Sequence, residues 1–154
     1  MSTVIESILI DELWDKPEFE GLITEYAHES SIEGLPPPEA KYETYQALES
    51  AGVLQTFAAY ECGELVGFLS LLMPIMPHYS QLVATTESYF VAHHARKSGA
   101  GLKLLRTAET FCRDHGAKGL LVSAPSHGRL AEVLPRVGYE ESNRVFFRSF
   151  MCQH

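Results

Sequence analysis

Apolar positions in the first third of the chain predict one strand and then two helices. The apolar-rich run at residues 5–13 is typical of a strand. Residues 15–18 (Asp-Lys-Pro-Glu) form a helix start, with an Asp cap and an early proline. The apolar positions that follow recur at helical spacing: Phe19, Leu22, Ile23, Tyr26 and Ala27. A proline-rich loop at 35–38 separates this helix from a second one, which is expected over 42–51.

The middle of the chain carries three long apolar runs, each of which predicts a strand. Two of them, at 53–61 and 65–73, are separated by Cys-Gly-Glu, a turn sequence that favours a β-hairpin. The segment at 73–79 holds two prolines, which lack the N–H that a central strand needs, so a loop is expected there. Residues 82–92 are rich in Thr, Tyr, Phe and Val and predict the third strand.

The last third of the chain alternates between helical and strand patterns. Apolar residues at helical spacing predict a helix over 102–115. A short buried strand is expected at 119–123, and a short helix at 129–137, where Pro135 interrupts or distorts it. A final strand is expected at 144–151.

This order of elements predicts a single α/β domain over residues 1–154. Strands and helices follow one another as β-α-α-β-β-β-α-β-α-β, which favours a mixed, mostly antiparallel central sheet flanked by helices. A chain of 154 residues is long enough to bury a core. Its 45% apolar and 21% charged content is ordinary for a globular protein.

Charge and cysteine content narrow the classes of function. With 12 basic and 20 acidic residues the net charge is −8, which argues against generic binding to nucleic acid or to an anionic membrane. The three cysteines include no C-x-x-C pair, so neither a zinc knuckle nor a disulfide framework is indicated, and no metal is expected. Thiols persist in a reducing compartment, and no run reaches the roughly 18 apolar residues of a membrane span. A cytoplasmic protein is therefore expected.

The most informative stretch is the glycine turn, Arg96 to Gly101, which lies between the third long strand and the next helix. Its glycines let the backbone bend tightly and approach a ligand without a Cβ in the way. A helix that begins there points free N–H groups and the positive end of its dipole at the turn. Arg96 and Lys97 add positive charge. Together these features predict a site for a phosphate or pyrophosphate.

Two common phosphate-binding motifs do not fit the glycine turn. A P-loop requires G-x-x-x-x-G-K-[ST], which the chain lacks. A dinucleotide fingerprint requires a third glycine, where the chain has Leu104, and a later acidic residue, where it has Leu120 and Leu121. The pattern that fits is R-x-x-G-x-G between a strand and a helix.

That pattern resembles the GCN5-related N-acetyltransferase (GNAT) superfamily. The match runs from Tyr89 to Leu102, and a later segment at 134–140 is similar to the family's Tyr-x-x-x-Gly-Phe element. The chain departs from the family at His93, where proline is common, and at Lys97, where glycine is common. The predicted elements follow the family's arrangement over nearly the whole chain.

The resemblance implies that the glycine turn binds the pyrophosphate of acetyl-CoA, chiefly through main-chain N–H groups. The preceding strand would pair with the pantetheine arm, in a gap where it splays from the 119–123 strand. A bulge there would turn the N–H of Val91 toward the thioester carbonyl and stabilise an oxyanion. The implied cofactor-binding residues are Phe90, Val91, Ala92, Arg96, Lys97, Ser98, Gly99, Ala100, Gly101, Leu102 and His127, the last standing where the family often has an Asn.

Acetyl transfer to an amine also needs a general base, because a lysine-like amine with a pKa near ~10.4 is protonated at neutral pH. Glu87 stands where many family members carry an acidic residue. Alternation along the strand places it on the same face as Tyr89 and Val91. Glu87 is therefore the candidate base, with His93 and His94 as alternatives and a solvated carboxylate without a catalytic role as the remaining interpretation.

The family's usual general acid, a tyrosine, corresponds to Leu134 in this chain. Tyr139 is the candidate replacement. A thiol pKa of ~8.5 also makes an unassisted thiolate tolerable, so solvent is an alternative, as are Tyr79, Ser126 and His127. The Ser126-His127 pair suggests a nucleophile, but no G-x-S-x-G elbow accompanies it.

The expected function is an N-acetyltransferase that moves an acetyl group from acetyl-CoA to a primary amine of a small molecule or protein, by direct attack in a ternary complex. Leu134 motivates one alternative, a non-catalytic acyl-CoA-binding module of the same fold. Another is a different nucleotide-phosphate binder, which ATP or NAD would stabilise. Neither nucleic acid nor a membrane is an expected partner. Family members often dimerise, so a homodimer remains an open alternative.

Overall fold

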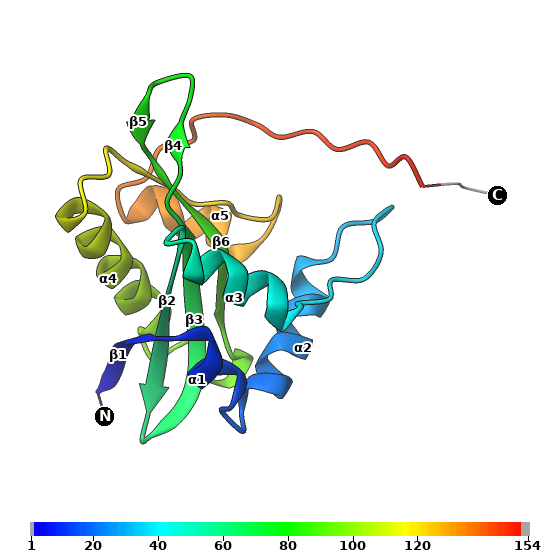
Figure 1. Ribbon diagram of the computed structural model, residues 1–154. Coiled ribbons are helices and arrows are strands. Elements are labelled where there is room, and N and C mark those ends of the chain that lie inside the picture. Colours follow the sequence, from blue (N-terminus) through cyan, green and yellow to red (C-terminus); the bar gives the residue numbers. More distant parts are fainter. Residues whose placement is uncertain (1, 152–154) are drawn as a thin grey trace.

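A five-stranded sheet forms the centre of the protein, which a computed structural model describes over residues 2–151 (Figure 1). Its strands lie in the order β1-β2-β3-β6-β7. All neighbouring pairs are antiparallel except β6 and β7, which are parallel. The predicted mixed, mostly antiparallel sheet is therefore confirmed. The strand bounds are Thr3–Ile8 (β1), Leu54–Glu61 (β2), Glu64–Leu72 (β3), Ala84–Val91 (β6) and Leu120–Leu121 (β7).

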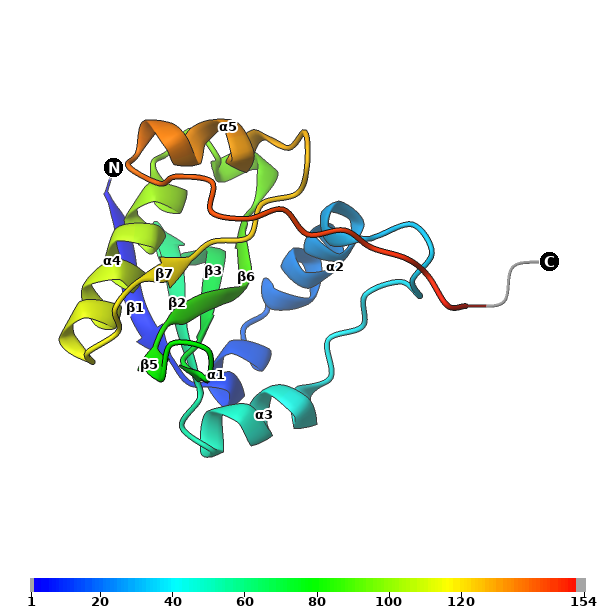
Figure 2. The ribbon, with the colours of Figure 1, turned by 90° about the horizontal axis from the view of Figure 1, so that it is seen from above.

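Helices cover both faces of the sheet. Helix α4 lies on one face against β1, β2, β3 and β6, and α2 lies on the other face against β3 and β6. The view from above shows the sheet between these two helices (Figure 2). Helix α1 packs on α2 and α3, and α3 also contacts β2. The bounds are Ile10–Trp14 (α1), Phe19–Ser30 (α2), Tyr42–Ser50 (α3), Ala100–Asp114 (α4) and Arg129–Arg136 (α5), with a 3-10 turn at His93–Ala95 (η1).

Each face of the sheet has its own apolar core. The core under α4 contains Leu69 and Leu104, whereas the core under α1 and α2 contains Phe68 and Phe90. Neighbouring residues of β3 thus enter opposite cores, as the two-residue period of a strand requires. The spacing of leucines that predicts α4 from the sequence is the spacing that buries its inner face.

The predicted hairpin in the middle of the chain is confirmed. β2 and β3 pair antiparallel and are joined by Cys62 and Gly63, whose φ angles are +51° and +76°. Two consecutive positive φ angles match the right-handed twist of the flanking strands, which is the geometry that short hairpin turns favour. The loop predicted at 73–79 instead contains a short strand, β4 (Ile75–Met76), which pairs with β5 (Gln81–Leu82).

The prediction of a strand over 5–13 is wrong in its second half. β1 ends at Ile8 and α1 begins at Ile10. Ile10 and Leu13 are 0% and 2% exposed. Their spacing of three residues puts both on the inner face of a helical turn. A continuous apolar run does not distinguish a buried strand from a short buried helix, so the sequence pattern misses this change.

Two predictions near the C-terminus also need correction. The strand expected at 119–123 is reduced to Leu120–Leu121, and Leu121 is 38% exposed rather than buried. The segment at 144–151 forms no strand in the described part of the chain, and Val145 is 88% exposed. Aromatic and β-branched residues favour a strand, but pairing also requires a neighbouring edge, which this segment does not reach.

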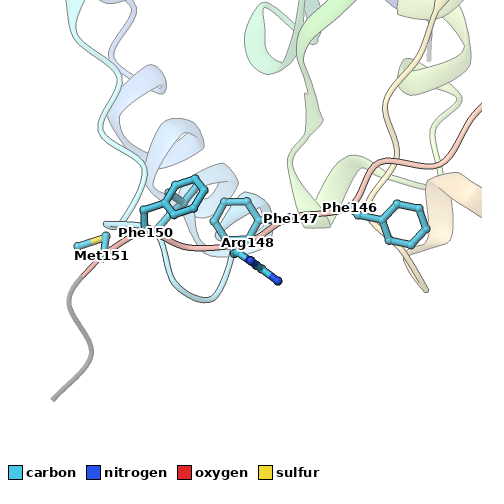
Figure 3. A pocket seen from close by; sticks show the side chains of 6 residues that line it. Phe146, Phe147, Arg148, Phe150 and Met151 are labelled. Atoms are coloured by element: carbon cyan, nitrogen blue, oxygen red, sulfur yellow. The ribbon is translucent and has the colours of Figure 1, made fainter.

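This C-terminal segment crosses toward the loop between α2 and α3 (Figure 2). The Ser149 hydroxyl donates a hydrogen bond to the carbonyl of Gly34 at 2.5 Å. Figure 3 shows the side chains of Phe146, Phe147 and Phe150 along a pocket of about 730 Å³. Over residues 2–151, none of the helices has both the length and the apolar content to cross a membrane.

Candidate functional site

Strand β6 separates from its parallel neighbour after two residues. Pairing is confined to Ala84 with Leu120 and Thr85 with Leu121. One further link follows, from the amide of Ser123 to the Thr86 hydroxyl at 3.2 Å. Beyond Thr86 the outer edge of β6 has no partner strand within residues 2–151. This splay was expected from the family resemblance, and it leaves a gap in strand pairing along the second half of β6.

The main-chain groups that face this gap follow from the antiparallel pairing with β3. The Ala92 amide donates to the carbonyl of Val66 at 2.7 Å, so Ala92 faces β3. Because alternate residues of an antiparallel strand face the same neighbour, Phe90 also faces β3, whereas Val91 faces the gap. Consistently, the Val91 carbonyl accepts a hydrogen bond from Arg96 Nε at 2.9 Å. Of the three residues expected to pair with a pantetheine arm, Val91 therefore has the correct orientation, and Phe90 and Ala92 do not.

The glycine turn leads directly into α4. Gly99 precedes the helix with φ +87°, a conformation that glycine adopts without strain. The amide of Lys103 in α4 donates to the Gly99 carbonyl at 3.1 Å. The amide of Ser98 donates to the Ala95 carbonyl, and that of Ala100 to the Ser98 hydroxyl, each at 3.2 Å.

Four other amides of the turn remain available. The N–H groups of Lys97, Gly99, Gly101 and Leu102 have no acceptor within the part of the chain that the structure describes. Free N–H groups at a helix N-terminus, together with its dipole, attract an anion. Of the six amides from Lys97 to Leu102, two are thus satisfied internally and four are free to bind an anion.

The two glycines of the turn have different surroundings. A Cβ on Gly99 would meet nothing within 4 Å, so the space beside it is open. A Cβ on Gly101 would lie 3.4 Å from Tyr89 Oη and 3.7 Å from Val91 Cγ2. A Cβ on Gly101 would thus make ordinary van der Waals contact with β6, whereas Gly99 borders open space.

The two basic side chains of the turn differ in how free they are to bind an anion. The Arg96 guanidinium is held by Glu29, with Nη2 at 2.7 and 2.6 Å from its two carboxylate oxygens. It also lies 5.3 Å from the centroid of the Phe90 ring. Lys97 is exposed and has no ion pair among the described residues. Lys97 is thus better able than Arg96 to meet an incoming anion.

Glu87 occupies a β-bulge in β6. Ser70 of β3 pairs with Ser88, and the next residue, Leu71, pairs with Thr86, so Glu87 is the extra residue. The bulge was expected near Val91 and lies upstream of it. Because an inserted residue reverses the alternation of side chains, the prediction that Glu87 shares a face with Tyr89 is wrong.

The Glu87 side chain turns instead toward α2 and α3. Tyr45 of α3 donates its hydroxyl to Glu87 Oε1 at 2.7 Å. The other oxygen, Oε2, is buried and has no hydrogen-bond partner in the described chain. Burial, then the hydrogen bond and charge of Glu87, raise the pKa of Tyr45 well above its usual range. Burial and the same charge raise the pKa of Tyr26 to about 12. Both phenols are therefore protonated at neutral pH.

Tyr139 lies on the opposite side of the sheet from Glu87. Its hydroxyl donates to Glu109 Oε2 of α4 at 2.6 Å. Burial, followed by this hydrogen bond and charge, raises the Tyr139 pKa. The structure therefore does not bring the two candidate catalytic side chains together. Leu134, at the usual tyrosine position, is 7% exposed.

The remaining candidates lie at the surface. His127 is exposed in the loop before α5, with φ +65°. His93 and His94 are exposed in η1, and the amide of His93 donates to Glu25 Oε1 at 3.0 Å. Sequence reasoning missed Tyr45, because no spacing pattern links it to a carboxylate 42 residues away.

Comparison with known sequences gives two matches. A model of the acetyltransferase (GNAT) family matches residues 11–139. The uncharacterized N-acetyltransferase YhfO of Bacillus subtilis (strain 168) is 36% identical over 84 residues, which are 54% of this chain and 56% of that protein. The latter match thus spans little more than half of the relative.

Several solved structures share the fold over nearly the whole chain. A ribosomal-protein-alanine N-acetyltransferase from Brucella melitensis biovar Abortus 2308 has a TM-score of 0.75 at 16% identity, covering 97% of this chain and 100% of that one. AAC(6')-Iy, in complex with the bisubstrate analogue CoA-S-monomethyl-acetylneamine, has a TM-score of 0.75 at 20% identity, covering 99% and 100%. An aminoglycoside acetyltransferase from an uncultured soil metagenomic sample, in complex with sisomicin, has a TM-score of 0.73 at 20% identity, covering 97% of both chains.

Proposed function

The chain belongs to the acetyltransferase (GNAT) family, and from this premise we propose that it transfers an acetyl group from acetyl-CoA to a primary amine. The observation that carries the proposal is the meeting of two features at one end of β6. The open strand edge begins after Thr86, and the free amides of the glycine turn begin at Lys97, six residues beyond Val91. A carrier with a diphosphate at one end and an extended amide-bearing arm matches both.

In this proposal the amides of Lys97, Gly99, Gly101 and Leu102 bind the diphosphate, and Lys97 adds a cation. The open space beside Gly99, which a Cβ would enter, supports this fit. The Val91 N–H faces the gap and is the candidate donor to the thioester carbonyl oxygen. Acetyl-CoA supplies the activated thioester, and its acyl carbon is the atom that the amine attacks.

Glu87 is the proposed general base. An amine with a pKa near ~10.4 must lose a proton before it can attack. The buried, unpartnered Oε2 of Glu87 supports this role, since a carboxylate oxygen without a donor in the chain can accept one from an amine. His93 and His94, exposed in η1, are the alternative bases.

We assign protonation of the departing thiolate to solvent. A thiol pKa of ~8.5 allows the thiolate to leave unassisted. Tyr139 remains a candidate acid, although its hydroxyl already donates to Glu109. His127 remains a candidate cofactor contact on family resemblance.

The acceptor is proposed to be a small-molecule or protein amine. One structural relative is an aminoglycoside acetyltransferase and another is a ribosomal-protein-alanine N-acetyltransferase, so both classes of amine belong in a test. The net charge of −8 favours a cationic acceptor. A cytoplasmic location and a homodimer complete the proposal, and light scattering after gel filtration tests the latter.

A parallel thermal-shift experiment tests the carrier. Acetyl-CoA, CoA, ATP and NAD are compared at about 100 times a micromolar-range Kd, where one-site binding adds about 2.7 kcal/mol. For a domain of this size that is a rise in Tm of roughly 5–10 °C. Stabilisation by acetyl-CoA but not by ATP or NAD supports the proposal. No rise with any CoA ester contradicts it.

A specific observation, the buried Leu134 in place of a tyrosine, favours one alternative function, a non-catalytic acyl-CoA-binding module. An assay of free-thiol release distinguishes the transferase from the binding module. Its panel of amines contains aminoglycosides, polyamines and N-terminal alanine peptides. Tight acetyl-CoA binding without amine-dependent thiol release on the whole panel favours the module.

A further inference from the structure

The carboxylate of Glu87 has two oxygens in different surroundings. Oε1 accepts the Tyr45 hydroxyl at 2.7 Å, whereas the buried Oε2 has no hydrogen-bond partner in the described residues. A buried acceptor without a donor destabilises a fold, so such atoms are rare and need an explanation. A ligand N–H that reaches Oε2 supplies the missing donor.

The Tyr45 hydroxyl is held in place by packing around its ring. The ring of Trp14 lies 5.4 Å from that of Tyr45, centroid to centroid, and 4.6 Å from that of Phe19. Helix α3 is fixed to α1 by a second contact, in which the amide of Ile10 donates to Glu49 Oε2 at 2.9 Å. The donor to Oε1 therefore comes from a helix that is anchored at Tyr45 itself and again at Glu49.

We propose that Tyr45 is a positioning residue, which binds Oε1 of Glu87 and so presents Oε2 to the acceptor amine. The inference rests on the proposed function, because it assigns a helper to the proposed base. It also connects α3, which packs on α1, to the strand that faces the proposed carrier.

The proton transfer balances without Tyr45 changing its state. The ammonium N–H bond breaks, an O–H bond forms on Oε2, and the electron pair stays on nitrogen for attack on the acyl carbon. Tyr45 keeps its proton and continues to donate to Oε1, since its raised pKa opposes ionisation. The titratable groups that face Glu87 are Tyr26 from α2 and Tyr45 from α3.

The test compares Tyr45→Phe with Tyr42→Phe. Both tyrosines lie on α3, both pack on Trp14, and each donates its hydroxyl to a carboxylate. The partner of Tyr42 is Asp11, which lies on α1, so Tyr42→Phe is a matched control that leaves Glu87 untouched. With an amine found active in the panel, kcat of Tyr45→Phe is expected to fall about tenfold, a part of the 10²–10⁴ that a positioned base contributes.

Two further readouts distinguish positioning from loss of folding. KM for acetyl-CoA is expected to stay within about twofold of the parent in Tyr45→Phe, because only the base is displaced. The acidic limb of the kcat/KM profile is expected to move to higher pH, because the carboxylate has lost a donor that favours its charged form. An equal fall of kcat in Tyr42→Phe, or an unmoved pH profile, overturns the inference.

Glu87→Gln separates the inference from the proposed function. If Glu87 is the base, the double variant with Tyr45→Phe is expected to be no slower than Glu87→Gln alone, since one residue acts through the other. If the two substitutions lower kcat multiplicatively in the double variant, the inference is overturned, and Glu87 remains the proposed base. If Glu87→Gln is fully active, Glu87 is not the base, and Tyr45 has no base to position.

Discussion

The hydroxyl of Tyr89 in β6 donates a 2.5 Å hydrogen bond to the carbonyl of Gly101 in the first turn of α4. This bond joins the two parts of the proposed carrier site, the open strand edge and the amide turn. Tyr89 is half-buried, and burial, followed by the charge of Glu109, raises its pKa to about 12. It is therefore a donor over the whole physiological range of pH.

Tyr89→Phe is expected to weaken acetyl-CoA binding several-fold and to lower the free energy of unfolding by about 1 kcal/mol, the usual net value of one hydrogen bond. The physical reason is that α4 loses its anchor to β6, so the amides of Gly101 and Leu102 are less fixed. Isothermal titration and chemical denaturation measure the two effects. Tyr60→Phe, at the far end of β2, serves as the control and is expected to leave affinity unchanged. Equal affinities of Tyr89→Phe and the parent protein would show that the anchor has no part in binding.

Gly99→Val is expected to reduce acetyl-CoA affinity by at least about tenfold, because its side chain enters the open space beside the free amides. The substitution also strains a backbone with φ +87° and lowers stability by about 1–2 kcal/mol. Gly116→Val is the matched control. Gly116 has φ +80°, lies at the other end of α4, and also has open space around its Cβ. If both variants lose affinity equally, backbone strain explains the loss, and the space beside the free amides does not.

Glu87→Gln is expected to lower the pH at which tyrosinate forms. Burial keeps the Tyr26 pKa above its usual value of 10.0, but the contribution from the Glu87 charge disappears, so the value falls from about 12. The Tyr45 pKa falls for the same reason. Ultraviolet absorbance during an alkaline titration reports both. Glu49→Gln, which changes a carboxylate within α3 itself, is expected to leave the titration curve unchanged. An unchanged curve for Glu87→Gln would contradict the contact between Glu87 and the two phenols.

Glu109→Gln is expected to change how stability depends on pH. Burial of Glu109 acts against ionisation, but hydrogen bonds from Tyr139 and Arg106 and the charge of Arg106 together hold its pKa below the usual range. A carboxylate with a depressed folded-state pKa stabilises the fold above its unfolded value and loses that contribution as pH falls. The difference in unfolding free energy between the parent and Glu109→Gln should therefore be largest near neutral pH. Denaturation series from pH 7 to below the ordinary pKa of 4.5 measure it, and a constant difference would contradict the assignment.

The sequence predicts most of the fold because most of its elements have strong periodic patterns. The helical spacing around Leu104 and Leu105 and the turn at Cys62 and Gly63 each have a single physical interpretation. The region after Ile8 does not, since three apolar residues in a row fit either a strand or a helix. The segment at 144–151 has strand composition, but composition does not supply a partner edge.

The sequence predicts one part of the candidate site, the glycine turn, but not the surroundings of Glu87. The glycine turn is a local motif, so Gly99 and its neighbouring amides were identified from spacing alone. The bulge at Glu87 was not, because an extra residue appears only when β3 and β6 are aligned. The hydrogen bond between Tyr45 and Glu87 depends on the packing of α3 on Trp14, which arises from contacts distant in sequence.

The reversed alternation at Glu87 has a practical consequence for engineering. The extra residue puts the Glu87 side chain beside Tyr45 of α3, whereas the Tyr89 side chain bonds to the first turn of α4 on the other face of the sheet. Under the proposed function, a chimera that exchanges 9–52 for the same region of a relative, but keeps Tyr45 and the two carboxylates that contact His93 and Arg96, is expected to acetylate different amines with a similar affinity for acetyl-CoA.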